Sequence, residues 1–453
     1  MTRLWIVVGA LAMASIAAAQ DRPRRSPLQS RVDAAAPGAT IDVAPGEYDG
    51  DLVIDRALHL VGHGRPLLLG SGTGTVLAIT APDVVVEGFD IDGRGGGDLG
   101  RDPSGIHIAA PRAVVRGCMI RNTLFGIYLR EAPGTRVEDC RIRGIKEKPA
   151  GEKGSGIHVW NTDGFTLLRN DVVDVRDGIY IQSSPHGVIR GNVARDVRYG
   201  LHYMYSDDNT FEDNVFERAD AGTAVMYSRR LTFKRNQFLH NRGFASVGLL
   251  LKTCDDVTAS ENVIADNARG IFLEGSARVE IRDNAIAESD VAVVLFDSTT
   301  ETTFTGNAFI GNLSPLSLVG KRPGARFVGN YWSDNDSPDL DGDGRSDQPY
   351  RLSSLFDHLR GNVTAADLFS RSLSANVVAA AERTLPVLDP VPVVDSSPLA
   401  HPPSQRWPEP ATWRERRAGA SGLLLSALAL VAGAAILTNG RRCRATAPLE
   451  ART

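Results

Sequence analysis

The feature that most constrains this chain is a pair of residue ladders with one common period. Glycines recur at spacings of 21, 30, 22, 22, 22, 26, 22 and 22 residues, at Gly105, Gly126, Gly156, Gly178, Gly200, Gly222, Gly248 and Gly270, with Ala292 in the last place. Fourteen residues after most of them stands an asparagine, at Asn170, Asn192, Asn214, Asn236, Asn262 and Asn284. Such a period is typical of solenoids, in which each repeat contacts only its neighbours.

Each repeat carries the pattern of a half-buried strand directly after its glycine. The residues one and three places on are apolar, as in Ile157 and Val159, which is the period of two of a strand with one buried face. A second apolar column stands two residues after the asparagines, at Val172, Ala194, Phe216, Phe238, Ile264 and Ile286. No repeat can bury its own apolar side, so each strand must pair with its copy roughly 4.8 Å away. The sequence predicts an all-β fold, a right-handed single-stranded parallel β-helix of the pectin-lyase type, over residues 28–350.

The asparagines are in phase with the buried column, so we expect them to point into a turn and to hydrogen-bond along the stack. Cys140 takes the same place, and Cys118 stands 22 residues before it. One strand spacing suits a disulfide, but parallel side chains do not, so a bridge and two buried thiols both stay open. Cys254 replaces a serine of another ladder and is expected to be structural. Residues 28–36 are expected to form a short helix that caps the open end of the stack.

The two ends of the chain indicate export and a membrane anchor. Arg3, an apolar run over 4–12 and three alanines at 17–19 predict a signal peptide over 1–19. Residues 418–437 form an uncharged apolar run of 20 residues, about the length of a transmembrane helix. The interval 351–417 reads as a proline-rich linker, and 438–453 as a short cytoplasmic tail. These features predict a periplasmic body anchored to the inner membrane by a C-terminal helix.

If positions one and three after each glycine point inward, positions two and four point outward on what we call the glycine-strand face. Position two gives His107, Tyr128, His158, Tyr180 and His202, and position four gives Trp160, Gln182, Met204 and Met226. His202 and Met204 are then about 6 to 7 Å apart on one strand. Imidazole and thioether form a soft ligand set that suits Cu(I). The predicted copper ligands are His202, Met204, Met226 and His158, and the alternative is a face that docks a partner without a metal.

Two insertions into the repeat fall near this face. Eight extra residues lie between Cys140 and Gly156, and four lie between Asn236 and Gly248, near His240. Both precede a glycine strand, so we expect loops there to bracket the outward His and Met residues, since insertions into repeats gather on the binding side.

A second candidate site follows the last repeat. Asp339, Asp341, Asp343 and Asp347 alternate with other residues, and Gly342 and Gly344 stand among them, as at the start of a calcium-binding loop. The closing Glu of such a loop is replaced by Tyr350. Calcium binding and an ordinary acidic turn are both compatible with this pattern.

Two motifs carry a resemblance to a known family. They are Gly-Leu-His-Tyr-Met-Tyr-Ser-Asp-Asp-Asn at 200–209, and Gly-Asn-Tyr-Trp-Ser-Asp at 329–334 with the acidic segment and Asp-Gln-Pro-Tyr after it. With them, residues 32–350 resemble NosD, the periplasmic β-helix accessory protein of nitrous oxide reductase maturation. The resemblance implies a non-enzymatic protein that works with an ABC-type ATPase and permease. It also implies that copper comes from a lipoprotein chaperone and serves the copper-sulfur centre of the reductase.

Two other classes stay open on the sequence. Many β-helices are polysaccharide lyases, hydrolases or epimerases, whose chemistry needs clustered carboxylates, or a base beside calcium-binding acids, on one outer face. The middle of the glycine-strand face offers His, Tyr, Trp, Gln and Met instead, although other faces carry Asp171, Asp174, Asp196 and Asp213. A docking scaffold is the third class. The net charge of -4 gives no basic field for nucleic acid.

Overall fold

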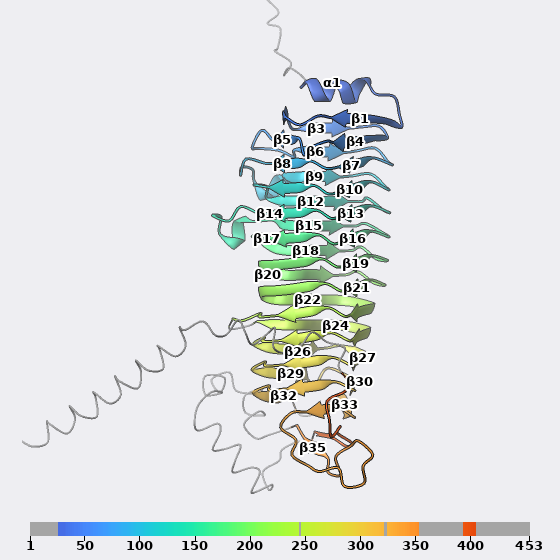
Figure 1. The fold of residues 1–453 in the computed structure, drawn as a ribbon, viewed down its shortest axis with the longest axis vertical. Coiled ribbons are helices and arrows are strands. Elements are labelled where there is room, and N and C mark those ends of the chain that lie inside the picture. Colours follow the sequence, from blue (N-terminus) through green and yellow to red (C-terminus); the bar gives the residue numbers. More distant parts are fainter. Residues whose placement is uncertain (1–25, 244–245, 321–323, 353–392, 405–453) are drawn as a thin grey trace, which may run out of the picture.

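The computed structural model describes residues 26–243, 246–320, 324–352 and 393–404, and over these ranges the chain is a right-handed parallel β-helix (Figure 1). Helix α1 (Pro27–Ala34) lies at the N-terminal end of the stack. Its Leu28 and Val32 are buried against the first coil. Both the predicted fold class and the predicted capping helix are confirmed.

Three faces of in-register parallel strands make up the solenoid. Two long strands, β20 (Val193–Met204) and β24 (Val247–Ser260), turn one corner between neighbouring faces, and β22 (Val215–Lys234) runs across all three faces. The first face, which includes parts of β22 and β24 between β21 and β27, holds β1 (Ala39–Val43), β4 (Leu58–Gly62), β7 (Val85–Glu87), β10 (Val114–Arg116), β13 (Arg136–Glu138), β16 (Thr166–Leu168), β19 (Val188–Arg190), β21 (Thr210–Glu212), β27 (Ala277–Arg282), β30 (Thr302–Thr305) and β33 (Ala325–Val328). The second face, which includes parts of β20 and β22, holds β2 (Glu47–Asp49), β5 (Leu67–Leu69), β8 (Asp90–Asp92), β11 (Met119–Arg121), β14 (Arg141–Arg143), β17 (Asp171–Val173), β23 (Gln237–Leu239), β25 (Val263–Ala265), β28 (Ala285–Ala287), β31 (Ala308–Ile310) and β34 (Tyr331–Trp332). The glycine-strand face, which includes parts of all three long strands, holds β3 (Leu52–Ile54), β6 (Leu77–Ile79), β9 (Ser104–Ile108), β12 (Phe125–Arg130), β15 (Ser155–Trp160), β18 (Asp177–Gln182), β26 (Arg269–Glu274), β29 (Val291–Phe296) and β32 (Ser314–Val319).

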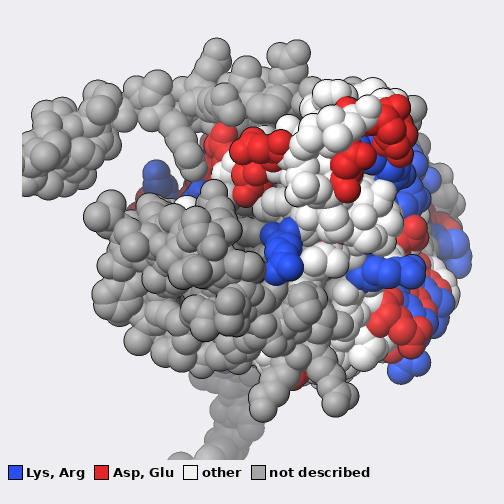
Figure 2. Space-filling view, turned by 90° about the horizontal axis from the view of Figure 1, so that it is seen from below, with Lys and Arg blue, Asp and Glu red and all other residues white. Residues whose placement is uncertain are grey.

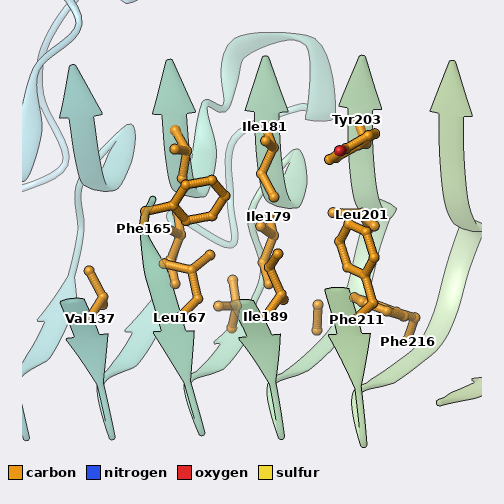
Figure 3. Close-up of a cluster of buried hydrophobic side chains, with 14 of the residues drawn as sticks. Val137, Phe165, Leu167, Ile179, Ile181, Ile189, Leu201, Tyr203, Phe211 and Phe216 are labelled. Carbon is orange, nitrogen blue, oxygen red and sulfur yellow. The ribbon is translucent and has the colours of Figure 1, made fainter. Parts of the chain in front are cut away.

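The core fills the space between the three faces. Both predicted apolar columns point into it, and Ile157, Val159, Val172 and Phe216 are all fully buried. Figure 3 shows side chains of the glycine-strand face, such as Ile179 and Ile181, packed against residues of the other strands. The inward-outward assignment made from the glycine ladder is therefore confirmed.

The asparagine ladder runs through the turn between the first and second faces. Each buried side chain donates to the amide oxygen of its copy in the next coil, as from Asn192 to Asn214 at 3.0 Å and from Asn214 to Asn236 at 2.9 Å. Cys140 continues the ladder, because its backbone N–H donates to the Asn170 side chain at 3.0 Å. Cys118, Cys140 and Cys254 are buried free thiols, so the structure supports two stacked thiols rather than a bridge.

The C-terminal end of the stack is closed by a segment from the interval predicted as linker. Strand β36 (Val394–Asp395) pairs with β33 and with β35 (Tyr350–Arg351). Buried Asp395 takes the next place in the ladder, since it accepts from the Asn330 backbone and side chain at 2.9 Å each. The linker predicted for 351–417 is thus interrupted by a docked strap, residues 393–404. This carboxylate and backbone hydrogen bonds such as that from Leu399 to Asn330 at 2.9 Å hold the strap, and composition alone does not reveal them.

Charged residues on the outside pair from coil to coil. Exposed arginines meet carboxylates about one coil away, as in Arg169–Asp139 at 2.7 Å and Arg218–Asp196 at 2.9 Å. Figure 2, which views the solenoid from its C-terminal end, shows acidic and basic side chains interleaved along one side. Exposed pairs of this kind stabilise a fold little, but they leave the visible side without a field of one sign.

Among the described ranges, no helix has the length and apolar character that a membrane span requires. The span predicted at 418–437, the signal peptide at 1–19 and the tail at 438–453 all lie outside these ranges.

Candidate metal site

The motif at 200–209 builds one corner of the glycine-strand face. Leu201 and Tyr203 point into the core, so His202 and Met204 point outward from β20. Buried Asn209 fixes the turn that follows, because its side chain donates to the Ser184 carbonyl at 2.9 Å and to the Tyr203 hydroxyl. The motif therefore sets the position of the two outward side chains.

Position two of the glycine strands forms a continuous stack of alternating histidine and tyrosine rings. The register pairs His107 with Tyr128, Tyr128 with His158, His158 with Tyr180 and Tyr180 with His202. Adjacent ring centroids lie 5.1, 4.4, 4.4 and 4.8 Å apart in that order. The predicted outward column is present, but neighbouring rings cover much of it.

Three long turns on the same side lead into glycine strands. The two predicted insertions form the loop over 144–154, which contains the short helix η2 (Ala150–Glu152), and the loop between β23 and β24. Sequence reasoning missed a third long turn over 93–103, with the short helix η1 (Leu99–Arg101). This turn leads directly into β9, which carries His107 at the N-terminal end of the ring stack.

His202 is oriented by a fully buried carboxylate. Its Nδ1 lies 3.2 Å from Oδ2 of Asp177, whose side chain has no exposed surface. Arg198 also holds this carboxylate, with its Nε at 2.9 Å from Oδ1. Burial alone would raise the pKa of Asp177, but the hydrogen bonds from His202 and Arg198 keep it below its ordinary value. With Nδ1 engaged, Nε2 is the nitrogen of His202 left to bind a ligand.

Met204 and Met226 stand next to each other in adjacent coils. They are register partners on β20 and β22, and both are half-buried. The residues that follow them in the chain, Tyr205 and Tyr227, are exposed, and their rings stack with centroids 5.1 Å apart. The structure thus brings three of the four predicted copper ligands, His202, Met204 and Met226, onto neighbouring positions of one face.

His158 does not join these three. Tyr180 lies between His158 and His202 in the ring stack, so the two histidines are separated by two coils, roughly 10 Å. The Nδ1 of His158 is buried and has no hydrogen-bond partner among the residues that the structure describes. His158, the fourth predicted copper ligand, is thus separated by a tyrosine ring from the place where His202, Met204 and Met226 meet.

The acidic segment folds into a loop whose carboxylates converge. Oxygens of Asp339, Asp341 and Asp343 lie within 4.8 Å of one another. Asp339 accepts from the backbone N–H groups of Gly342 and Gly344 at 2.8 and 2.9 Å. Asp347 closes the loop by accepting from the Leu340 N–H at 2.7 Å. All four predicted calcium ligands therefore belong to one compact loop.

Three of the four outer carboxylates considered for polysaccharide chemistry are already paired. Asp171, Asp196 and Asp213 each engage an arginine of the next coil, at 2.7, 2.9 and 2.7 Å, and Asp174 is half-buried. Asp177, the carboxylate beside the ring stack, is buried and bound to Arg198. A glycosidase pair needs two carboxyl groups that face the sugar.

Comparison with known proteins agrees with the two motifs. A family model described as periplasmic copper-binding protein (NosD) matches residues 143–337. A protein of Pseudomonas aeruginosa named probable ABC transporter binding protein NosD is 34% identical over 381 residues, which cover 80% of this chain and 88% of that protein. A protein of the same name from Stutzerimonas stutzeri is 32% identical over 381 residues, covering 80% and 86%. Among solved structures, the Yersinia enterocolitica family 28 exopolygalacturonase has a TM-score of 0.53 at 13% identity, covers 67% of this chain and 74% of that chain, and shows the fold alone.

Proposed function

This chain belongs to the NosD family, and we propose that it is a periplasmic accessory protein that binds Cu(I) as cargo and hands it on, without being an enzyme. The observation that carries this proposal is the imidazole of His202, held by Asp177 at 3.2 Å, beside the in-register pair Met204 and Met226.

The chemistry of these donors suits Cu(I). Thioether sulfur is a soft ligand, and soft ligands favour Cu(I) over the harder ions Mg²⁺ and Ca²⁺. A histidine that ligates a metal commonly donates its other N–H to a carboxylate, as His202 can to Asp177. One imidazole and two thioethers leave room for a further ligand from a donor or acceptor protein, which a site for cargo needs.

The partners follow from the family. Two relatives are named as binding proteins of an ABC transporter, and we propose an ABC-type ATPase and its permease as partners of this chain. We further propose that a lipoprotein chaperone supplies the copper, and that it serves the copper-sulfur centre of nitrous oxide reductase. The apolar run at 418–437 would hold the solenoid to the inner membrane beside the permease.

A Cu(I) titration against a chelating competitor, under reducing conditions, tests the proposal. The protein should compete for one Cu(I), and the triple variant His202→Ala, Met204→Leu, Met226→Leu should lose this tight site while circular dichroism shows an intact β-helix. Met119→Leu is the matched control, because Met119 lies on β11 of the second face. His158→Gln should change the affinity by less than about threefold, since its ring is roughly 10 Å from His202. Unchanged affinity in the triple variant would refute the assignment.

We also propose that the loop at 339–347 binds Ca²⁺ and stabilises the C-terminal end. The convergence of Asp339, Asp341 and Asp343 within 4.8 Å supports it, as hard carboxylate oxygens are calcium ligands. Millimolar Ca²⁺ should raise the melting temperature of the wild type but not of Asp341→Asn. An equal rise in both proteins would show that calcium acts elsewhere.

A further inference from the structure

We propose that Asp177 is a positioning residue, which fixes the proton of His202 on Nδ1 and so keeps Nε2 free to bind the metal. This inference rests on the proposed function, and it adds a residue that is not itself a ligand. Asp177 comes from β18, one coil before His202 and 25 residues away in the chain.

The hydrogen bonds around Asp177 place a proton on Nδ1 of His202. A deprotonated carboxylate only accepts, so the nitrogen that faces it must carry hydrogen. Oδ2 of Asp177 lies 3.2 Å from His202 Nδ1 and also accepts from Arg198 Nη2 at 2.7 Å. Arg198 Nε donates to the other oxygen at 2.9 Å. Both oxygens are thus held by donors, and of the two neutral tautomers of His202 this arrangement selects the one with its free electron pair on Nε2.

Aromatic neighbours hold the same ring from its sides. Tyr180 meets His202 edge to face at 4.8 Å, and Tyr199 does so at 5.1 Å. The guanidinium of Arg198 lies over the Tyr199 ring, 4.3 Å from its centroid. Asp177, Arg198, Tyr199 and His202 therefore form a closed cluster, and the imidazole cannot turn over without breaking contacts of its neighbours.

The fold itself does not need a carboxylate at this place. In-register neighbours along the same column are Ser155 in the coil before, Tyr199 in the coil after and Ala221 in the coil beyond. Ser155 is as fully buried as Asp177. A buried charge destabilises a protein unless it is paired and hydrogen-bonded. A charge kept where a serine suffices one coil away points to a role beyond packing. Besides Arg198 and Arg176, whose Nε lies 3.4 Å from Oδ2, the group that the carboxylate contacts is His202.

Replacement of Asp177 by asparagine should reverse the tautomer. Arg198 requires an acceptor and will take the single amide oxygen, so the amide NH₂ turns toward His202. Nδ1 must then accept, and the proton moves to Nε2, where it blocks the metal. Loss of a carboxylate behind a ligating histidine typically lowers metal affinity about 10- to 100-fold, and we expect a loss in that range.

The test uses the full chain labelled with ¹⁵N-histidine, first without metal. Long-range ¹H–¹⁵N spectra should show Nε2 of His202 unprotonated in the wild type and protonated in Asp177→Asn, with the signal assigned by His202→Gln. Cu(I) competition should then show the affinity loss. Asp163→Asn is the matched control, because Asp163 and His186 form a similar pair at 2.7 Å on an exposed turn and neither is a proposed ligand.

Asp177→Ser guards against misfolding, because the preceding coil already carries Ser155 there. It should fold and lose affinity as well. An unchanged tautomer in Asp177→Asn, or unchanged Cu(I) affinity in both Asp177 variants, would overturn the inference. If the wild type binds no Cu(I), the proposed function fails, whereas the tautomer spectra still decide the role of Asp177.

Discussion

His158 and His202 stand in one column of one face, yet their surroundings give them different chemistry. His202 has a carboxylate on Nδ1 at 3.2 Å, whereas Nδ1 of His158 is buried and finds no partner within the described part of the chain. Burial, with the charge of Arg176 nearby, lowers the pKa of His158 to about 3. Residue type and register made the two equivalent in the sequence, and only the neighbouring coils distinguish a candidate ligand from a packed ring.

The depressed pKa of His158 predicts a pH dependence of stability. Below the unfolded pKa near 6.5, the unfolded chain protonates this residue but the folded chain does not, so stability falls as the pH drops from about 6.5 toward 3. Between pH 7 and pH 5 this share is roughly 2 kcal/mol. His158→Gln should remove it, as chemical denaturation at the two pH values would show. His63→Gln, at an exposed position, is the control. Identical pH dependence in His158→Gln and the wild type would contradict the prediction.

Asp177 shows why part of the site could not be predicted from the sequence. The glycine ladder assigned His202, Met204 and Met226 to one outer face, because strand alternation is a local rule. Asp177 instead stands directly before Gly178, at the bend into the strand. Its contact with His202 crosses from one coil to the next, and a periodic pattern does not show which side chains at a bend turn toward the next coil.

At the scale of the single coil, the asparagine ladder was the most predictable element. Its spacing placed an amide at the same turn of each coil. A buried amide needs hydrogen-bond partners, and its copies in the neighbouring coils supply them. The third long turn at 93–103 was missed. The other two were found as enlarged distances between successive ladder glycines, and this turn precedes the first of those glycines.

Asn214→Ala should destabilise the middle of the solenoid. The side chain donates to the Ile189 carbonyl and to Asn236, both at 2.9 Å, and accepts from the Asn192 backbone at 3.0 Å. Loss of these partners inside the core should lower the free energy of unfolding by about 2 to 4 kcal/mol. Hydrogen exchange should rise first in the adjoining coils.

Gln237→Ala serves as the control for this ladder, since Gln237 is only half-buried on the next coil of the second face. A loss of stability for Asn214→Ala no larger than that for Gln237→Ala would mean that the ladder contributes little.

The whole molecule is closed at both ends. Helix α1 covers the first coil and the strap at 393–404 covers the last (Figure 1), which protects the open strand edges from pairing with other chains. The sequence predicted the first cap, because it directly precedes the repeats. The second was hidden, since Asp395 meets Asn330 across 65 residues of chain.

Asp395→Ala should release the strap. The carboxylate accepts from Gly329, Asn330 and the Trp332 indole at 2.9, 2.9 and 3.2 Å, and these donors lie in a buried site. We expect a lower melting temperature and faster proteolytic cleavage within 393–404. Ser396→Ala, at an exposed neighbouring position, should behave like the wild type. A strap equally resistant to protease in Asp395→Ala would show that other contacts hold it.

Locating the copper itself would decide whether one outer face of the solenoid holds Cu(I) between His202, Met204 and Met226. Crystals of the full chain loaded anaerobically with Cu(I) would be measured on either side of the copper absorption edge. We expect one strong anomalous peak within bonding distance of both methionine sulfurs and of Nε2 of His202. A peak at the buried thiols or at another face, with none beside Met204 and Met226, would contradict this expectation.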